Sequence, residues 1–273
     1  MIDGFLAADY QVHTRLSHDG RCTIIEQCER AVTLGLEEIG FSEHKDFDPA
    51  DPVVDYFDYD RYAAEIAEAR TRYAGRLTIR MGVEVDYQRW FEDRIAAYLS
   101  NHRFDYVIGS VHYAGGAMLM TPEYTVGRDA ETAYRVYYEA VRDSVDSGLI
   151  DILGHLEYAN RRGVPAYGAF DPAPYRAIVS DLFARMAARG VALEINTAGL
   201  RQGAGSFYPC VEHVALYSAS GGRLLTLGSD SHHPDDLAAD YAVAARAAWD
   251  HGLREIAVYE DRTPRAVPLR PAG

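Results

Sequence analysis

The sequence is poor in cysteine, in lysine and in long hydrophobic runs. Its 273 residues contain three cysteines, Cys22, Cys28 and Cys210, an odd number that forms no C-x-x-C motif and argues against a disulfide scaffold. Such sparse cysteine use is typical of a reducing compartment, so we expect a cytoplasmic protein. Lys45 is the only lysine, and nearly all of the positive charge therefore comes from arginine.

No segment has the length and composition of a membrane span or a leader peptide. The longest stretch without a formal charge, residues 106–122, contains His112, two adjacent glycines and Pro122 and would make a poor membrane helix. The first nine residues have neither a basic start nor a useful apolar run, so no signal peptide is expected. No G-x-G-x-x-G motif follows the first predicted strand, which argues against a dinucleotide-binding domain.

Acidic residues outnumber basic residues by 41 to 27, which gives a formal net charge of −14. A surface with this charge repels polyphosphate backbones, so a nucleic-acid partner is not expected. A small anionic substrate is still compatible with the charge, because the local field of a site can oppose the field of the whole protein. Hydrophobic residues make up 48% and charged residues 25%, which is the composition of an ordinary folded protein.

Short apolar runs alternate with longer helical patterns along the whole chain. The clearest helical pattern covers residues 174–189, where apolar residues recur every three or four positions between Pro174 and a stop at Gly190. A second predicted helix covers residues 130–147 and stops at Gly148. The predicted strands lie near residues 8–14, 37–43, 78–86, 104–112, 149–156, 191–197 and 223–230.

Seven strand–helix units without a break in composition predict an α/β fold, a closed (β/α)7 barrel formed by residues 1–273 as a single domain. An open doubly wound sheet is the alternative. The strands are mostly continuous apolar runs, as parallel strands buried on both faces require. Residues 45–58 and 113–127 are predicted to be long loops that shape a substrate pocket, and the Pro- and Arg-rich tail after Glu260 is expected to be frayed.

Nearly every predicted strand ends in a side chain that can bind a metal ion. Since the carboxyl ends of barrel strands meet on one face, we expect these side chains to converge there. Crowded imidazoles and carboxylates would be costly without a cation, and their nitrogen and oxygen donors suit zinc, iron or manganese. In chain order the strand ends carry His13, His18 and Asp19, then His44, Glu84 and Asp86, His112, His155 and Glu157, Glu194, and finally Asp230 and His232.

A single histidine at a strand end is more often a hydrogen-bonded structural residue than a metal ligand. Here, however, five of the ten histidines end apolar runs, and this joint placement favours ligands. The histidines in helical or loop contexts, His102, His213 and His251, are interpreted as structural. Three carboxylates either orient ligating histidines or form surface salt bridges: Asp86, Glu157 and Glu194.

These motifs, taken in order, resemble the PHP (polymerase and histidinol phosphatase) family over about residues 9–240. The most similar branch is that of the monofunctional histidinol-phosphatases, because of the Glu-x-Asp-Tyr motif at residues 84–87 and the Glu-Ile-Asn-Thr-x-Gly-Leu-Arg motif at residues 194–201. The remaining motifs are Asp9-Tyr10-Gln11-Val12-His13-Thr14, Ser42-Glu43-His44, Gly109-Ser110-Val111-His112, Gly154-His155-Leu156-Glu157 and Ser229-Asp230-Ser231-His232-His233-Pro234.

The resemblance implies a distorted TIM-like (β/α)7 barrel that holds three divalent metal ions, namely zinc, iron or manganese. One carboxylate, Glu84, is implied to bridge two of these ions. By motif the first ion is held by His13, Glu84 and Asp230, the second by Glu84, His112 and His155, and the third by Asp19, His44 and His232.

One departure from the family pattern concerns Gln11. The family's opening motif is His-x-His, and Gln11 occupies the position of the first histidine. Its carbonyl oxygen can bind a metal but is a weaker ligand than imidazole for zinc or iron. We therefore expect Gln11 to be a weak ligand of the first ion, or to shift that site toward manganese, or to mark an inactive member.

The resemblance implies hydrolysis of a small phosphorylated substrate, L-histidinol phosphate. Three carboxylates neutralise half of the charge of three divalent ions, and the remainder suits a phosphate dianion and a hydroxide. The expected mechanism is attack of a metal-activated hydroxide on phosphorus, with Arg201 on the phosphoryl oxygens and Asp230, His232 or water protonating the leaving group. Arg162 is interpreted as a solvated loop charge. Further substrate contacts are expected from Arg161 and His18, and from Glu157 or Asp86 to the substrate's ammonium group.

Three other interpretations stay open. The first is a PHP-type phosphoesterase that acts on another ester, such as a nucleotide or a phosphotyrosyl peptide. The second is an amidohydrolase, whose barrel requires a strand-end lysine as the metal bridge; Lys45 follows His44, but Glu84 already occupies the bridging position. The third is a non-catalytic metal-binding protein, which the substitution at Gln11 suggests.

Overall fold

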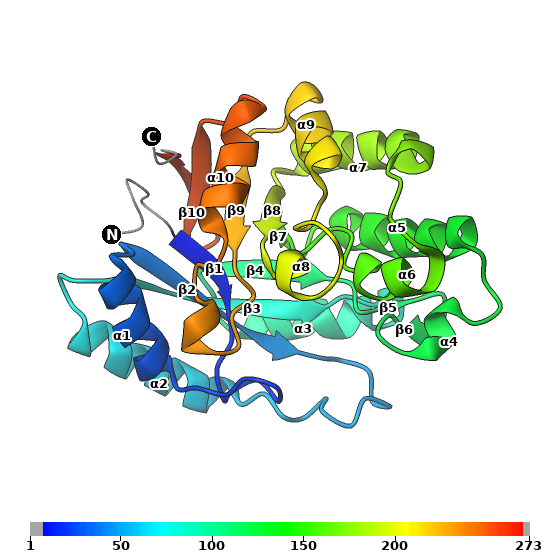
Figure 1. Cartoon of the computed structure of the whole chain (residues 1–273). Coiled ribbons are helices and arrows are strands. Elements are labelled where there is room, and N and C mark those ends of the chain that lie inside the picture. The colour runs from blue at the N-terminus through cyan, green and yellow to red at the C-terminus, as the bar shows by residue number, and fades with distance from the viewer. Residues whose placement is uncertain (1–7, 270–273) are drawn as a thin grey trace.

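The computed structural model describes residues 8–269, and at its centre a parallel sheet curls into a nearly closed barrel (Figure 1). Every pairing in this sheet is parallel, and the spatial order of the strands follows their order in the chain. The predicted distorted (β/α)7 barrel is thereby confirmed. The strands are β1 (Ala8–Val12), β2 (Glu38–Lys45), β3 (Thr78–Asp86), β4 (Tyr106–Ser110), β7 (Ile152–Leu153), β8 (Ala192–Asn196) and β9 (Leu225–Gly228).

The segment after β9 returns to β1 and nearly closes the ring. Val12 forms an isolated parallel bridge with Ser231, and the His13 amide donates to the Ser231 carbonyl at 2.8 Å. The Ser231 amide donates in turn to the Gln11 carbonyl at 3.2 Å. This closure places the first and last strand ends side by side, although they are more than 200 residues apart in the chain.

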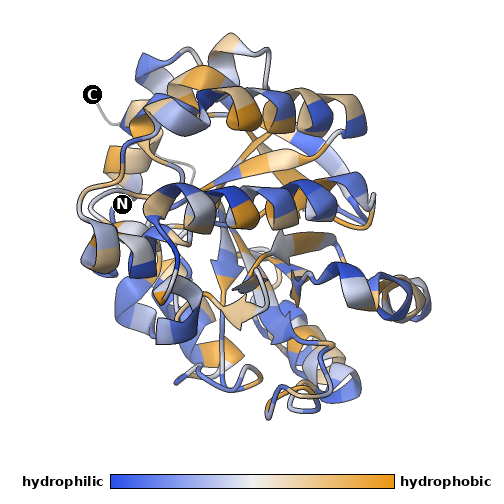
Figure 2. Cartoon of the chain, turned by 90° about the vertical axis from the view of Figure 1, so that its right-hand side faces the viewer, coloured by the Kyte–Doolittle hydropathy of each residue, from blue (hydrophilic) through white to orange (hydrophobic). Residues whose placement is uncertain are grey.

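Helices cover the outside of the barrel in the connections between strands, and hydrophobic and hydrophilic residues alternate along them (Figure 2). Three short 3-10 helices lie at residues 89–91, 173–175 and 234–236. The helices are α1 (Ile24–Leu34), α2 (Tyr59–Arg72), α3 (Glu92–Asn101), α4 (Pro122–Thr125), α5 (Ala130–Asp146), α6 (Asn160–Tyr167), α7 (Arg176–Arg189), α8 (Ala198–Arg201), α9 (Val211–Ala219) and α10 (Tyr241–Asp250).

The two clearest predicted helices are confirmed as α5 and α7. In α7 the predicted stripe is buried at Val179, Leu182, Phe183 and Met186, because these positions fall on one face of a 3.6-residue period. The helix ends at Gly190, whose left-handed backbone (φ 72°) suits a residue without a β-carbon.

Tyr106 of β4 fills the interior of the barrel and explains two glycines. A β-carbon at Gly40 would lie 2.4 Å from the Tyr106 hydroxyl oxygen and one at Gly82 2.2 Å from the Tyr106 ring, too close for a real contact, so β2 and β3 need glycine there. The Tyr106 hydroxyl lies 2.8 Å and 3.0 Å from the carbonyl oxygens of Tyr10 and Phe41. A large polar side chain is thus accommodated in the core with its hydroxyl satisfied.

The end of the described chain forms an antiparallel hairpin of β10 (Glu255–Glu260) and β11 (Thr263–Pro268). The Tyr259 amide donates to the Tyr10 hydroxyl at 2.7 Å, and the Arg262 guanidinium pairs with Asp151 just before β7 at 2.8 Å. The hairpin therefore lies at the amino-terminal end of the barrel. The expectation of a frayed tail after Glu260 is wrong up to residue 269, and residues 270–273 lie outside the described part of the chain.

The two predicted loops differ in their structure. Residues 46–58 connect β2 to α2 without a helix or strand, as predicted. The segment 113–127 is more ordered than predicted, because β5 (Tyr113–Ala114) pairs with β6 (Ala117–Met118) and α4 follows. Among residues 8–269, no helix combines the length and the hydrophobicity needed to cross a membrane.

Candidate metal centre

Four imidazoles converge on one buried carboxylate, Glu84 of β3, which has no exposed surface. Its Oε1 lies 2.9 Å from His155 Nε2 and 3.7 Å from His112 Nε2. Its Oε2 lies 2.9 Å from His44 Nδ1 and 3.4 Å from His13 Nε2. Both carboxylate oxygens are therefore shared between histidines that come from different strand ends.

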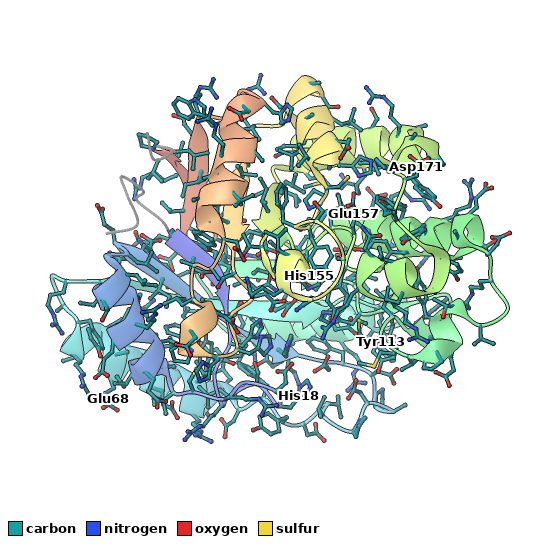
Figure 3. All side chains as sticks on the ribbon, in the orientation of Figure 1. His18, Glu68, Tyr113, His155, Glu157 and Asp171 are labelled. Carbon is teal, nitrogen blue, oxygen red and sulfur yellow. The ribbon has the colours of Figure 1, made fainter. Side chains whose placement is uncertain are left out.

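Two further carboxylates complete the cluster. Asp230 Oδ1 lies 3.4 Å from His13 Nε2, and the left-handed backbone of Asp230 (φ 54°) turns the chain sharply after β9. Asp19 lies 3.6 Å from His44 Nε2 and 3.2 Å from His232 Nε2. The structure thus brings together the three residue sets that the sequence motifs define. In Figure 3 His155 lies near the middle of the molecule and His18 nearer its lower edge.

The crowding of imidazoles fits bound cations. The His13 ring is stacked between His44 at 4.3 Å and His232 at 4.4 Å. Three buried atoms here, His13 Nε2, His232 Nε2 and Glu84 Oε2, lie close to other polar atoms but have no partner in hydrogen-bond geometry among the described residues. Buried polar atoms are normally paired, and coordination to a metal would satisfy these lone pairs. The potential ligand atoms of His13, His44 and His232, and those of Glu84, His112 and His155, lie within 4.8 Å of one another in each set.

The electrostatics agree with this interpretation. Burial opposes ionisation of Glu84, but the close imidazoles of His44 and His155 hold its pKa well below the usual range. Burial also opposes protonation of His232, yet the adjacent Asp19 carboxylate raises its pKa to about 9. Burial lowers the pKa of His13 and of His112, the latter to about 4, so the histidines of the centre differ in their affinity for a proton. A metal that binds here would have to displace any proton on its ligands.

Asp86 and Glu194, two of the three carboxylates without a ligand assignment, hydrogen-bond to the backbone of candidate ligands. Asp86 accepts the His112 amide at 2.9 Å and lies 3.5 Å from His112 Nδ1. Glu194 accepts the His155 amide at 2.8 Å. Burial raises the pKa of Asp86 to about 6 and that of Glu194 to about 8. Both are buried and hold the backbone of a candidate ligand, which supports the interpretation that they orient histidines; the alternative of surface salt bridges is wrong for them.

Glu157, two residues after His155, holds the backbone turn that follows β7. Its backbone is left-handed (φ 81°), and its buried carboxylate accepts the Cys210 amide at 2.8 Å and contacts His213 Nδ1. The Tyr137 hydroxyl accepts the amide of Glu157 at 2.9 Å. Glu157 therefore fixes the turn that follows His155 and does not reach the cluster itself, which leaves it unsuited to meet a substrate's ammonium group.

Gln11 lies against Glu84 with both of its amide atoms engaged. Asn196 Oδ1 accepts the Ala198 amide at 3.0 Å, so its Nδ2 faces Gln11 and donates to Gln11 Oε1 at 2.7 Å. Gln11 Nε2 then donates to Glu84 Oε1 at 2.8 Å. In this arrangement the Gln11 carbonyl is not free for a cation, and its role as a ligand stays a prediction.

The residues expected to contact substrate differ in their placement. His18 lines a cavity above the cluster, next to Asp19. The Arg161 guanidinium donates to the Tyr158 hydroxyl at 2.9 Å, and Tyr158 lines the same cavity. Arg201 instead donates to the Ser229 carbonyl at 2.5 Å and lies 3.5 Å and 3.6 Å from carboxylates of the surface residues 236 and 240. Its contact with phosphate stays a prediction.

Sequence reasoning gave Glu43 no role, although it belongs to a quoted motif. Its carboxylate has no exposed surface and accepts the Thr14 hydroxyl at 2.6 Å and the Ser17 hydroxyl at 2.5 Å. The Ser17 hydroxyl also accepts the His44 amide at 2.9 Å. Glu43 thereby holds the turn that carries His18 and Asp19. The position of Glu43 next to His44, at the end of an apolar strand, could have predicted this role.

Comparison with known proteins agrees with this geometry. The model of the PHP domain family matches residues 9–198. A probable histidinol-phosphatase of Deinococcus radiodurans is 32% identical over 91% of this chain and 95% of its own length, and the histidinol-phosphatase of Lactococcus lactis is 30% identical over 82% and 83%. The crystal structure of histidinol phosphate phosphatase from Lactococcus lactis, in complex with zinc, L-histidinol and phosphate, matches with a TM-score of 0.85 at 26% identity, over 95% of this chain and 99% of that one. The chain belongs to the PHP domain family.

Proposed function

We propose that the protein is a metal-dependent phosphomonoesterase that hydrolyses L-histidinol phosphate to L-histidinol and phosphate. The observation that carries the proposal is the convergence of four imidazoles on the buried Glu84, with Asp19 and Asp230 beside them. Relatives that align over most of their length are named histidinol-phosphatases. The related Lactococcus lactis structure holds zinc, L-histidinol and phosphate.

The donor set fits three divalent ions of zinc, iron or manganese, because imidazole nitrogen and carboxylate oxygen suit all three metals. Bound ions of this kind lower the pKa of a coordinated water and neutralise charge on phosphoryl oxygens. Glu84 would bridge two ions, and Asp86 and Glu194 would keep His112 and His155 in place. We assign the ions to His13, Glu84 and Asp230, to Glu84, His112 and His155, and to Asp19, His44 and His232.

The substrate would enter through the cavity beside His18. We assign Arg161 to the phosphoryl group, because its guanidinium donates to the hydroxyl of Tyr158 at the wall of this cavity. Asp230 and His232 remain our candidates for returning a proton to the leaving alcohol. We place the protein in the cytoplasm, which its three buried free cysteines favour, and expect no nucleic-acid partner.

The amidohydrolase alternative lacks its bridging residue. Lys45 Nζ donates to the Val54 carbonyl at 2.9 Å and lies over the ring of Phe47, so it does not face the cluster. Glu84 occupies the position between the candidate ligands that such a lysine would need. The alternative of a non-catalytic member requires a direct test of turnover.

The test measures phosphate release by the zinc-loaded protein from L-histidinol phosphate, p-nitrophenyl phosphate, a nucleotide and a phosphotyrosyl peptide. We expect the highest kcat/KM with L-histidinol phosphate. His155→Ala should lower this kcat/KM at least about 100-fold without loss of fold, because the ion that we assign to Glu84, His112 and His155 loses one of its ligands. The control His251→Ala, outside the cluster, should stay within about twofold of wild type. Release from no ester would favour the non-catalytic alternative.

A further inference from the structure

The cavity above the metal centre is small and acidic. Its volume is about 250 Å³, below the range of drug-sized ligand pockets, so it suits a small metabolite. His44, His112 and Asp19 form its floor, and the loop after β2 contributes two more carboxylates, Asp46 and Asp51. Among the described residues that line it there is no lysine or arginine.

The two carboxylates of this loop differ in what they already bind. Asp51 uses both oxygens, since Oδ1 accepts the Val53 amide at 2.9 Å and Oδ2 accepts the Tyr113 hydroxyl at 3.0 Å. Asp46 directly follows the end of β2 and is half-buried. Its carboxylate makes no hydrogen bond or ion pair among the described residues, and the charged groups near it are His44, His112, Asp51 and Asp86. Asp46 is thus the acidic group of the wall that is free to bind a ligand.

We propose that Asp46 selects phosphate monoesters whose carbon skeleton carries an organic cation, an ammonium or imidazolium group, by pairing with that cation while the phosphate lies at the metal centre. The inference rests on the proposed function and names the specificity-determining residue of the same cavity. It replaces Glu157, which is engaged with Cys210 and His213, as the partner of the substrate's positive charge.

The remaining walls support this choice. Val53, Met118 and Tyr158 line the cavity and offer apolar and aromatic surface to a flat ring. An anionic skeleton, such as that of a nucleotide, would meet the carboxylates of Asp46 and Asp51 in the cavity wall and be repelled. A cationic ester is attracted at one end by the metals and at the other by Asp46, so both of its charges are compensated within one small cavity.

The test compares kcat/KM for L-histidinol phosphate and p-nitrophenyl phosphate, an ester without a cation, in zinc-loaded wild type, Asp46→Asn and the control Asp55→Asn. Asp55 is exposed on the same loop, does not line the cavity, and gives the same change in net charge. For Asp46→Asn we expect the ratio of the two kcat/KM values to fall about 10- to 100-fold. The loss should be confined to the cationic ester, because removing a negative charge does not weaken the binding of an anion. Asp55→Asn should leave the ratio unchanged.

An equal loss with both esters, an unchanged ratio, or loss of zinc from Asp46→Asn would overturn the inference, the last by assigning Asp46 to the metal centre. The proposed function fails separately if wild type hydrolyses p-nitrophenyl phosphate but not L-histidinol phosphate.

Titration calorimetry of wild type and Asp46→Asn with L-histidinol and with inorganic phosphate then tests the role of Asp46 in binding alone. Asp46→Asn should weaken L-histidinol binding at least about tenfold and phosphate binding far less. Equal weakening, or no binding of L-histidinol by wild type, would contradict the role of Asp46.

Discussion

Gln11 stands where the family pattern has a histidine, and its surroundings show what the exchange does to the cluster. An imidazole at this position would offer a lone pair to a metal, whereas the Gln11 amide donates a hydrogen bond to Glu84 at 2.8 Å. The amide is held in this orientation by Asn196. The same Glu84 oxygen also lies 2.9 Å from His155 Nε2, so Gln11 stabilises the carboxylate that we place between two ions.

We predict that Gln11→His tightens the binding of the first ion at least about tenfold, because imidazole is a stronger zinc ligand than an amide oxygen. Competition with a chromogenic chelator would measure the zinc affinity, and elemental analysis the number of ions retained. The control Gln11→Leu, which removes the donor without adding a ligand, should bind no more tightly than wild type. Equal affinity of wild type and Gln11→His would mean that the glutamine is no handicap.

At this scale the strand-end residues were predictable, and so was the support that Asp86 and Glu194 give to ligating histidines, but the partners of Glu157 were not. His155 and Glu84 are 71 residues apart, yet both end apolar strands, and barrel geometry brings such ends together. The pairing of Glu157 with His213 has no comparable signal, because His213 lies on α9 and its partner depends on how that helix packs. For Arg201 the motif predicted a phosphate contact; its guanidinium binds the Ser229 carbonyl here, and the phosphate contact stays a prediction.

Among the elements, the hairpin of β10 and β11 departs most from the sequence expectation. Proline lacks an amide hydrogen, so Pro264 and Pro268 suggested an irregular tail. In the structure β11 pairs only with β10 within its two-stranded sheet, and an edge strand tolerates proline. β7 departs in the other direction, because the predicted strand 149–156 pairs only at Ile152–Leu153. The chain turns immediately after that pair to deliver His155.

We predict that Tyr259→Ala destabilises the barrel by about 3–5 kcal/mol, the usual cost of removing a buried aromatic ring. Tyr259 is 1% exposed, and the centre of its ring lies 6.2 Å from that of Tyr10 and 6.3 Å from that of Tyr106. Calorimetry should show Tm lower by roughly 6–20 °C. Zinc content should be unchanged, because the hairpin lies at the end of the barrel away from the centre.

The matched control is Arg265→Ala, on the exposed edge of the same hairpin, opposite Val258. Its Tm should stay within about 2 °C of wild type, as for most exposed substitutions. If the Tm of Tyr259→Ala were no lower than that of this control, the hairpin would not contribute to the core of the barrel.

At the scale of the whole molecule, barrel closure and charge act together. The fold class was predictable because seven apolar runs alternate with helices, and a closed ring is the arrangement that brings β9 back beside β1. The net charge of −14 repels anions at long range, so binding of an anion would depend on the positive charge of ions held inside the barrel. The metal ions would thus neutralise the carboxylates of the centre and supply the positive field for phosphate.

We predict that removing the ions with a chelator lowers the stability of the whole barrel together with its activity. A ligand present at about 1,000 times its dissociation constant stabilises a fold by about 4 kcal/mol per site, which corresponds to roughly 8–16 °C in Tm. Calorimetry before and after dialysis against a chelator, with elemental analysis of both samples, would measure the change, and added zinc should restore both Tm and turnover. His155→Ala should show a smaller chelator-induced drop, because one ligand of the centre is already gone. If wild type lost its metal yet kept its Tm, the buried histidines and carboxylates would be neutralised by their own ion pairs, and the fold would not depend on bound cations.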